Sequence, residues 1–155
     1  MYKKTTKELE EILEHTHPKD IENFVKANED DLLNGDRNFM KYMNERLKEK
    51  GLQKQDVLLR ADISQGYGYK LLTEEKVTKQ RDIILRICYA ANFTLKETQQ
   101  ALKIYQMDIL YARNPRDALL MTFFNEHPGS IIDINEMLLA NKMMPSDLVG
   151  CMNRC

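Results

Sequence analysis

Apolar residues recur every three or four positions along most of the chain, which is the spacing of amphipathic α-helices. Two helices are predicted within the first 28 residues, and Leu9, Ile12 and Leu13 share one face of the first. Asn34-Gly35-Asp36 is a loop signal and the best candidate for a domain boundary. We therefore expect a separate N-terminal helical segment over residues 1–37.

The pattern becomes more regular after this boundary. Phe39, Met43 and Leu47 recur every four residues and form one apolar stripe that stops before Gly51, a residue suited to a helix C-terminus. Four further helical segments follow, so that residues 38–106 read as a five-helix domain. The five helices are predicted at about 38–50, 53–61, 65–72, 78–92 and 94–105.

The second and third of these helices are short and are separated by a turn of about three residues. Asp62 stands at this turn, and aspartate tolerates the left-handed backbone region better than most residues. Ser64 follows and is suited to the N-cap of the next helix. Thr94 and Glu97 fit a capping box at the start of the fifth helix.

Two more helices are predicted in a C-terminal extension over residues 107–155. Asn114-Pro115 combines a cap residue with proline at the first helical position, and this helix ends before His127. A last helix is expected at about 134–141. No strand alternation persists, so the predicted fold class is all-α.

The composition agrees with a water-soluble helical protein. Hydrophobic residues make up 43% and charged residues 30% of 155 residues, whereas glycine (6) and proline (4) are scarce. No stretch approaches the roughly 18 apolar residues of a membrane span, and acidic sequence follows the basic start where a secretory signal would be apolar. Three cysteines form no disulfide framework, so we expect a cytoplasmic protein without a membrane partner.

The charge is unevenly distributed, although the net charge is only −1. Residues 1–37 carry six basic and ten acidic side chains, whereas residues 38–81 carry ten basic and six acidic ones. Residues 82–155 are nearly balanced, with seven basic and eight acidic side chains. The positive charge thus gathers around the two short helices, which favours a polyanionic partner; chance variation among solvated helix faces is the alternative.

Residues 51–65 resemble the helix-turn-helix of the phage-repressor and Cro-like (XRE) family of bacterial regulators. Tyr67-Gly68-Tyr69-Lys70, Arg81-Asp82, Glu97-Thr98-Gln99 and the segment from Tyr111 to Ala118 are similar to a group of small XRE-like proteins of Gram-positive bacteria. The resemblance covers about residues 39–140. It implies a five-helix repressor-type domain whose third helix, at 65–72, enters the major groove of DNA.

The resemblance also implies the residues that would contact DNA. The helix that Ser64 begins offers contacts to bases or backbone, where glutamine can pair with adenine and lysine can reach guanine or phosphate. The start of the preceding helix and the loop after the recognition helix would grip phosphates. The candidate DNA-binding residues are Gln53, Lys54, Ser64, Gln65, Gly66, Tyr67, Tyr69, Lys70, Lys76, Lys79 and Arg81.

Three residues depart from the family pattern. Asp62 stands where glycine is common, Leu58 where a small alanine is common, and Gly68 where a β-branched core residue is common. We expect Leu58 to fill the room that the missing side chain of Gly68 leaves. Tyr67 and Tyr69 lie on different faces of the helix, so either can be a DNA contact and the other a core residue.

No catalytic, cofactor or metal site is predicted. Cys151 and Cys155 with His127 lack the second ligand pair of a structural zinc site, and His15 and His17 have no partner that a catalytic base requires. No phosphate-binding glycine loop or nucleophile elbow is present. We therefore expect a non-enzymatic protein with no cofactor.

Two functions remain open. The first is a DNA-binding transcriptional regulator, expected to be a homodimer because two copies match a palindromic site. The second is an adaptor that uses the same fold to bind a protein partner. The basic middle segment favours the regulator, whereas two glycines and no arginine in the helix at 65–72 favour the adaptor.

Overall fold

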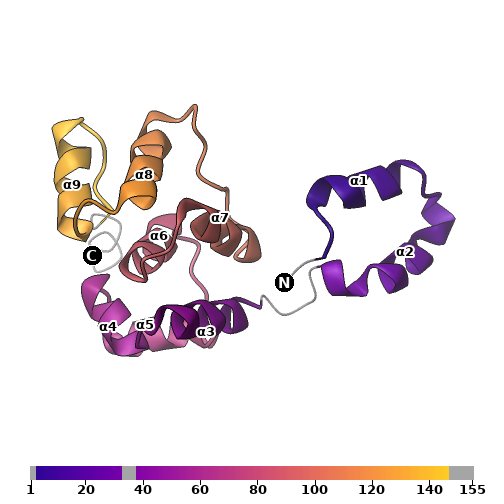
Figure 1. Ribbon diagram of the computed structural model, residues 1–155, viewed down its shortest axis with the longest axis horizontal. Helices are drawn as coiled ribbons and strands as arrows, with labels where there is room; N and C mark the ends of the chain where they lie inside the picture. Colours follow the sequence, from indigo (N-terminus) through magenta and orange to yellow (C-terminus); the bar gives the residue numbers. More distant parts are fainter. Residues whose placement is uncertain (1–2, 33–37, 147–155) are drawn as a thin grey trace. The chain divides into compact units, whose positions relative to one another are not determined.

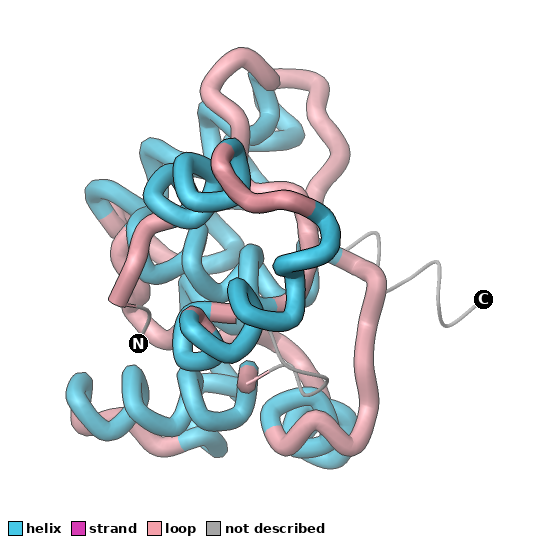
Figure 2. The backbone as a smooth tube through the Cα atoms, turned by 90° about the vertical axis from the view of Figure 1, so that its right-hand side faces the viewer, coloured by secondary structure: helices cyan, strands magenta, loops and turns pink. Residues whose placement is uncertain are grey.

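The computed structural model describes residues 3–32 and 38–146, and every regular element in these ranges is helical (Figures 1 and 2). The chain divides into two compact units, residues 1–36 and 37–155. The predicted boundary signal Asn34-Gly35-Asp36 lies outside the described residues. In the described ranges, no helix combines the length and apolar character that crossing a membrane requires.

The N-terminal unit contains two short α-helices and two single 3-10 turns. Thr5 and Glu8 form a capping box before the first helix, and Asp31 accepts hydrogen bonds from the backbone N–H groups of Lys3 and Lys4. Phe24 is the buried apolar side chain among the described residues of this unit. Its elements are α1 (Thr6–Glu14), η1 (Pro18–Asp20), α2 (Ile21–Ala27) and η2 (Glu29–Asp31).

The larger unit contains seven α-helices within its described residues. The two helices of the C-terminal extension pack on α6 and α7 and belong to the same compact unit as the preceding five helices. The elements are α3 (Phe39–Lys50), α4 (Lys54–Arg60), α5 (Gln65–Leu72), α6 (Arg81–Ala90), α7 (Leu95–Ile104), α8 (Pro115–Glu126) and α9 (Ile131–Ala140).

Helix α6 is the centre of this unit. Nine of its ten residues are buried, and it packs against α4, α7 and α9. The apolar stripe predicted on α3 lies in the same core, where Phe39 meets Tyr105 edge to face at 4.9 Å between ring centroids. Burial of this many large apolar side chains is the main driving force for folding.

Five helices end in the same backbone conformation. Each is followed by a residue with positive φ, and the next residue donates its N–H to a carbonyl five positions back, as Ile63 does to Leu58 at 3.0 Å. Glycine adopts this conformation at the end of α3, and four side-chain-bearing residues adopt it elsewhere. The five residues are Gly51, Asp62, Asn92, Gln106 and Lys142.

Two predicted helix starts are displaced by three residues. Helix α6 begins at Arg81 and not near Thr78, because the Thr78 N–H donates to the Tyr105 hydroxyl and its own hydroxyl accepts the N–H of Gln80. Helix α9 begins at Ile131 and not at residue 134, because the carboxylate of Asp133 accepts the N–H of Ser130. Side-chain hydrogen bonds thus define where α6 and α9 begin.

The predicted capping box of α7 carries a charge partner from α3. Glu97 accepts a hydrogen bond from the Thr94 N–H at 3.0 Å and pairs with the Lys50 ammonium at 2.9 Å. Partial burial by itself would raise the pKa of Glu97, but the hydrogen bonds from Thr94 and Lys50 outweigh it and lower the pKa. The folded protein therefore binds a proton at this carboxyl less readily than the unfolded chain.

This shift predicts an acid-dependent loss of stability. The contribution of Glu97 to the free energy of unfolding is fully present above the ordinary carboxyl pKa of 4.5. It disappears as the pH falls through the lower pKa that this carboxyl has in the folded protein. Urea unfolding of Glu97→Gln at a series of acidic pH values should show a weaker decline of the free energy of unfolding than the wild type. Glu126→Gln, on an exposed position of α8, is the matched control; an unchanged decline for Glu97→Gln contradicts the prediction.

Candidate nucleic-acid interface

Helices α4 (Lys54–Arg60) and α5 (Gln65–Leu72) are joined by four residues, Ala61, Asp62, Ile63 and the N-cap residue Ser64. Asp62 has φ +56°, as its identity predicted, and its N–H donates to the Leu59 carbonyl at 3.1 Å. Arg86 of α6 holds the turn from the inside, since its guanidinium donates to the Asp62 carbonyl at 2.9 Å. This buried arginine was not recognised from the sequence, because its position on an apolar helix gives no local signal.

The predicted compensation between Leu58 and Gly68 is confirmed. Leu58 of α4 is fully buried, and a Cβ atom at Gly68 of α5 would lie 2.4 Å from its Cδ2 atom. Two carbon atoms that are not bonded to each other do not approach this closely in folded proteins. The two helices can therefore pack at this distance only because Gly68 has no side chain. The missing side chain and the larger leucine thereby define how α4 and α5 pack.

The first turns of α4 and α5 lie together. The Gln65 amide donates to the Gln55 carbonyl at 3.0 Å, which brings the start of α5 next to the segment that contains Gln53 and Lys54. Gln53 is exposed at the N-cap of α4, and Lys54 is half-buried. The bidentate adenine contact predicted for Gln65 therefore requires this hydrogen bond to break.

The other predicted residues of α5 differ in accessibility. Ser64 occupies the N-cap position and is exposed, but its side chain makes no capping hydrogen bond. A Cβ atom at Gly66 would meet no atom within 4 Å, so a ligand can approach the backbone there. Tyr67 packs against the core, whereas Tyr69 is 40% exposed. Of the two tyrosines, Tyr69 is therefore the one whose ring a ligand can reach.

Four lysines lie on α4, α5 and the loop after α5. Lys76 donates its N–H to the carbonyl of Lys70 at 3.0 Å, so the loop folds back on the end of α5. Lys76 and Lys79 are exposed, and Lys70 and Lys54 are half-buried. None of the four forms a salt bridge within residues 3–32 and 38–146. Their charges are therefore available to an anionic partner.

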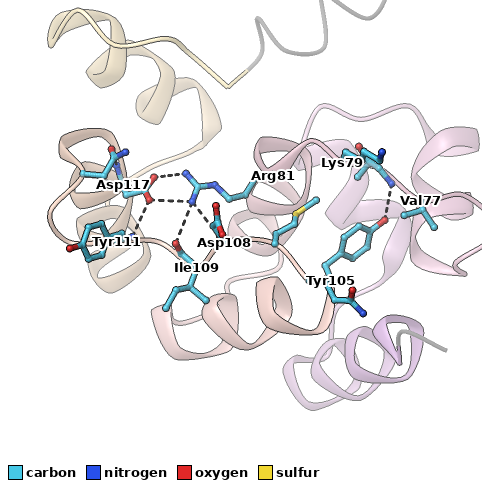
Figure 3. A pocket seen from close by; sticks show the side chains of 12 residues that line it. Val77, Lys79, Arg81, Tyr105, Asp108, Ile109, Tyr111 and Asp117 are labelled. Atoms are coloured by element: carbon cyan, nitrogen blue, oxygen red, sulfur yellow. Dashed lines mark hydrogen bonds and ion pairs between the residues drawn. The ribbon is translucent and has the colours of Figure 1, made fainter. Parts of the chain in front are cut away.

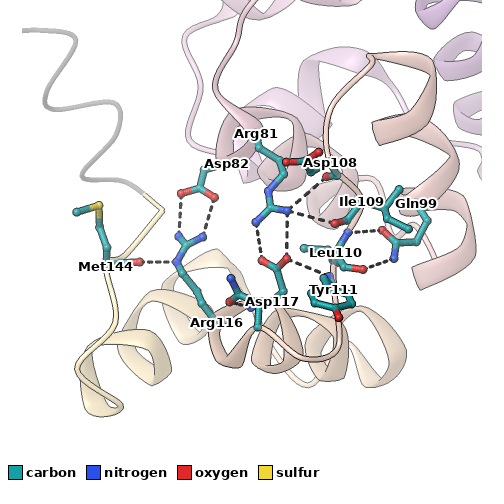
Figure 4. A network of polar contacts seen from close by, with 11 residues as sticks. Arg81, Asp82, Gln99, Asp108, Ile109, Leu110, Tyr111, Arg116, Asp117 and Met144 are labelled. Atoms are coloured by element: carbon teal, nitrogen blue, oxygen red, sulfur yellow. Dashed lines mark hydrogen bonds and ion pairs between the residues drawn. The ribbon is translucent and has the colours of Figure 1, made fainter.

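Arg81 departs from the predicted phosphate grip. Its guanidinium makes a bidentate ion pair with the Asp117 carboxylate and also donates to the carbonyls of Asp108 and Ile109 (Figure 4). The side chain is 25% exposed, and that of Asp117 is 4% exposed. We correct the expectation accordingly: Arg81 fastens α6 to the start of α8.

A second pair of the same kind lies beside the first. Arg116 donates to both carboxylate oxygens of Asp82, at 3.0 and 2.8 Å, and its Nε donates to the Met144 carbonyl (Figure 4). Helices α6 and α8 thus each carry an Arg-Asp dipeptide in the first turn, and the arginine of each dipeptide pairs with the aspartate of the other. The residues of the resemblance around Arg81 and Arg116 consequently have a structural role here.

A groove of about 940 Å³ runs along this network, between the loop after α5 and the loop after α7 (Figure 3). Lys79 and Val77 lie at one end, and Tyr111 at the other, while the Arg81–Asp117 pair lies in its wall. Arg81 and Asp117 in the wall neutralise each other, and the lining also contains the exposed carboxylate of Asp108. The groove therefore presents Lys79 as its unpaired cation among the described residues.

Metal-binding groups are not gathered in the described part of the chain, where no three residues of His, Cys, Asp and Glu could hold an ion together. His127 contacts protein groups: its Nε2 lies 2.7 Å from the Phe93 carbonyl, and its ring stacks on Tyr89. Cys151 and Cys155, considered above with His127, lie outside the described residues. Cys88 is buried, which raises the pKa of its thiol and makes it unreactive.

Comparison with known proteins identified no relative. No protein-family model, curated protein or solved structure matches the chain. The resemblance to XRE-like regulators consequently stays a prediction that is based on the residues quoted above. The fold and the site define an all-helical protein with a basic, partly exposed pair of short helices.

Proposed function

We propose that this protein is a DNA-binding transcriptional regulator of the helix-turn-helix type, in which α3 to α7 form a five-helix repressor-like domain. Helix α5 would enter the major groove, with Tyr69 and the residues around Gly66 towards the bases. Such a protein acts where bacterial DNA is found, in the cytoplasm.

One observation carries this proposal. A short turn over residues 61–64, with Asp62 in the left-handed region, connects two short helices. Lysines that form no salt bridge within the described residues lie on both helices and on the loop that follows the second. A protein that neutralises DNA phosphates needs cations that are not paired internally, because counterion release supplies most of the affinity. Lys54, Lys70, Lys76 and Lys79 meet this condition, and Arg81 does not.

The test is the salt dependence of binding to a labelled duplex of random sequence, measured by fluorescence anisotropy from about 50 to about 200 mM salt. The wild type should bind at low salt and lose affinity steeply as salt rises. Lys70→Ala, Lys76→Ala and Lys79→Ala should each reduce the logarithmic salt slope by about 1. Lys103→Ala, on α7, is the matched control and should leave the slope unchanged.

The adaptor function predicts a different result. A protein that recognises another protein through apolar contacts would show no binding to the duplex even at low salt, and the lysine variants would not differ from the wild type. The absence of arginine from α5 and the exposed aliphatic side chains described below favour this second candidate.

A further inference from the structure

The two most exposed aliphatic side chains of the described residues lie on opposite sides of one groove. Leu59 of α4 is 73% exposed, and Ile132 of α9 is 68% exposed. The groove has a volume of about 590 Å³ and is separate from the lysines of the candidate DNA interface. Its lining also includes Arg60, Asp62, Tyr89, Ala90, Ser130 and Asn135.

Single exposed aliphatic residues are common on protein surfaces, but a cluster of them marks an interaction site. Leu139, which is 60% exposed, follows Ile132 by seven residues and therefore lies on the same face of α9 two turns later. Leu59 adds a third aliphatic side chain across the groove. Helix α9 thus has a buried face, towards the core, and an exposed side on which nothing in the described residues covers Ile132 and Leu139.

The walls of the groove are held in place by internal hydrogen bonds. The Tyr89 hydroxyl donates to the Gly129 carbonyl at 2.8 Å, and Asn135 accepts from the N–H and the hydroxyl of Ser146. Arg86 fixes Asp62 from below. Binding at a surface that is already formed costs little ordering entropy, so a modest apolar contact suffices there.

The charges at the rim indicate which partner fits. Arg60 lines the α4 side of the groove, and Glu136 lies on α9 one helical turn after Ile132. Both residues are exposed, and neither has a salt bridge within the described residues. A two-fold axis through the groove would place α4 of one copy against α9 of the other. Arg60 of each copy would then face Glu136 of its partner, around an apolar centre.

We propose that this groove is the self-association surface of the protein, and that a second copy of the chain occupies it through α9. The pairing is isologous, with Ile132 and Leu59 of each copy at the centre and the Arg60–Glu136 pairs at the rim. It does not depend on DNA binding, because the lysines of α5 and the following loop take no part in it.

The first test is sedimentation equilibrium of the full-length protein without DNA, from micromolar to sub-millimolar concentrations. The wild type should dimerise, and Ile132→Asp and Leu59→Asp should each raise the dissociation constant by about tenfold or more. Ile109→Asp, at an exposed aliphatic position outside the groove, should have no such effect. A wild type that stays monomeric throughout, or an Ile132→Asp protein that dimerises normally, overturns the proposal.

The second test reverses the rim charges. Arg60→Glu and Glu136→Arg should each weaken the homodimer, because like charges then face each other twice. An equimolar mixture of the two variants should form a heterodimer, since both pairs become opposite in charge. A mixture that associates no better than either variant alone contradicts the two-fold arrangement. Duplex binding at low salt is measured on the same variants, so failure here is distinguishable from failure of the proposed function.

Discussion

Replacing Asp117 with alanine should lower the free energy of unfolding by about 3–5 kcal/mol, the usual cost of breaking a buried ion pair from one side. The Asp117 side chain is 4% exposed and accepts hydrogen bonds from the Arg81 guanidinium and the Tyr111 N–H. Without it, a largely buried positive charge loses its counter-charge. Urea unfolding followed by circular dichroism measures the change.

Two comparisons separate the ion pair from other effects at this position. Asp108→Ala removes a carboxylate from an exposed residue of the same groove and should change the free energy of unfolding by less than about 0.5 kcal/mol. The double variant Arg81→Met with Asp117→Leu should recover much of the loss, because both buried charges are then absent. If Asp117→Ala is as stable as the wild type, the pair does not fasten α6 to α8.

Replacing Leu58 with alanine should cost about 2–5 kcal/mol, because the leucine is fully buried and the site is tightly packed. Replacing Gly68 with alanine should also destabilise the protein, for the opposite reason. The new methyl group would lie 2.4 Å from the Leu58 Cδ2 atom, and the two helices would have to separate.

The double variant tests whether these effects have one cause. Combining Leu58→Ala with Gly68→Ala places a small methyl group in the room that the leucine vacates, so the two losses should not add. We expect the double variant to be more stable than the sum of the single variants predicts by at least about 1 kcal/mol. Gly66→Ala on the same helix is the control, since its Cβ meets nothing within 4 Å. Strictly additive losses would show that Leu58 and Gly68 do not compensate each other.

Local signals predicted most helix boundaries. Helix α5 covers the expected residues 65–72, Asn114 caps α8 with Pro115 at its first position, and Thr94 with Glu97 begins α7. Such signals act between residues three or four positions apart, and their hydrogen bonds form wherever the helix forms. The left-handed conformation of Asp62 was predictable from the residue itself, because aspartate tolerates this backbone region better than most residues.

The later start of α6 and the internal pairing of Arg81 could not be predicted from such local signals, because both depend on residues far apart in the sequence. Residues 78–80 stay in a loop because the Tyr105 hydroxyl, 27 positions away, accepts the N–H of Thr78. Arg81 pairs with Asp117, which is 36 positions away. An exposed phosphate contact and a buried ion pair look the same in the sequence, because both need an arginine near a helix start.

By itself the sequence determined an all-helical chain, the turn between two short helices, and the compensation of Gly68 by Leu58, because these depend on neighbouring residues and on side-chain volume. Only the tertiary structure decided which cations remain unpaired, which tyrosine of α5 faces solvent, and that Leu59 and Ile132 share a groove. Those features depend on distances between segments far apart along the chain, and such distances exist only once the core has formed.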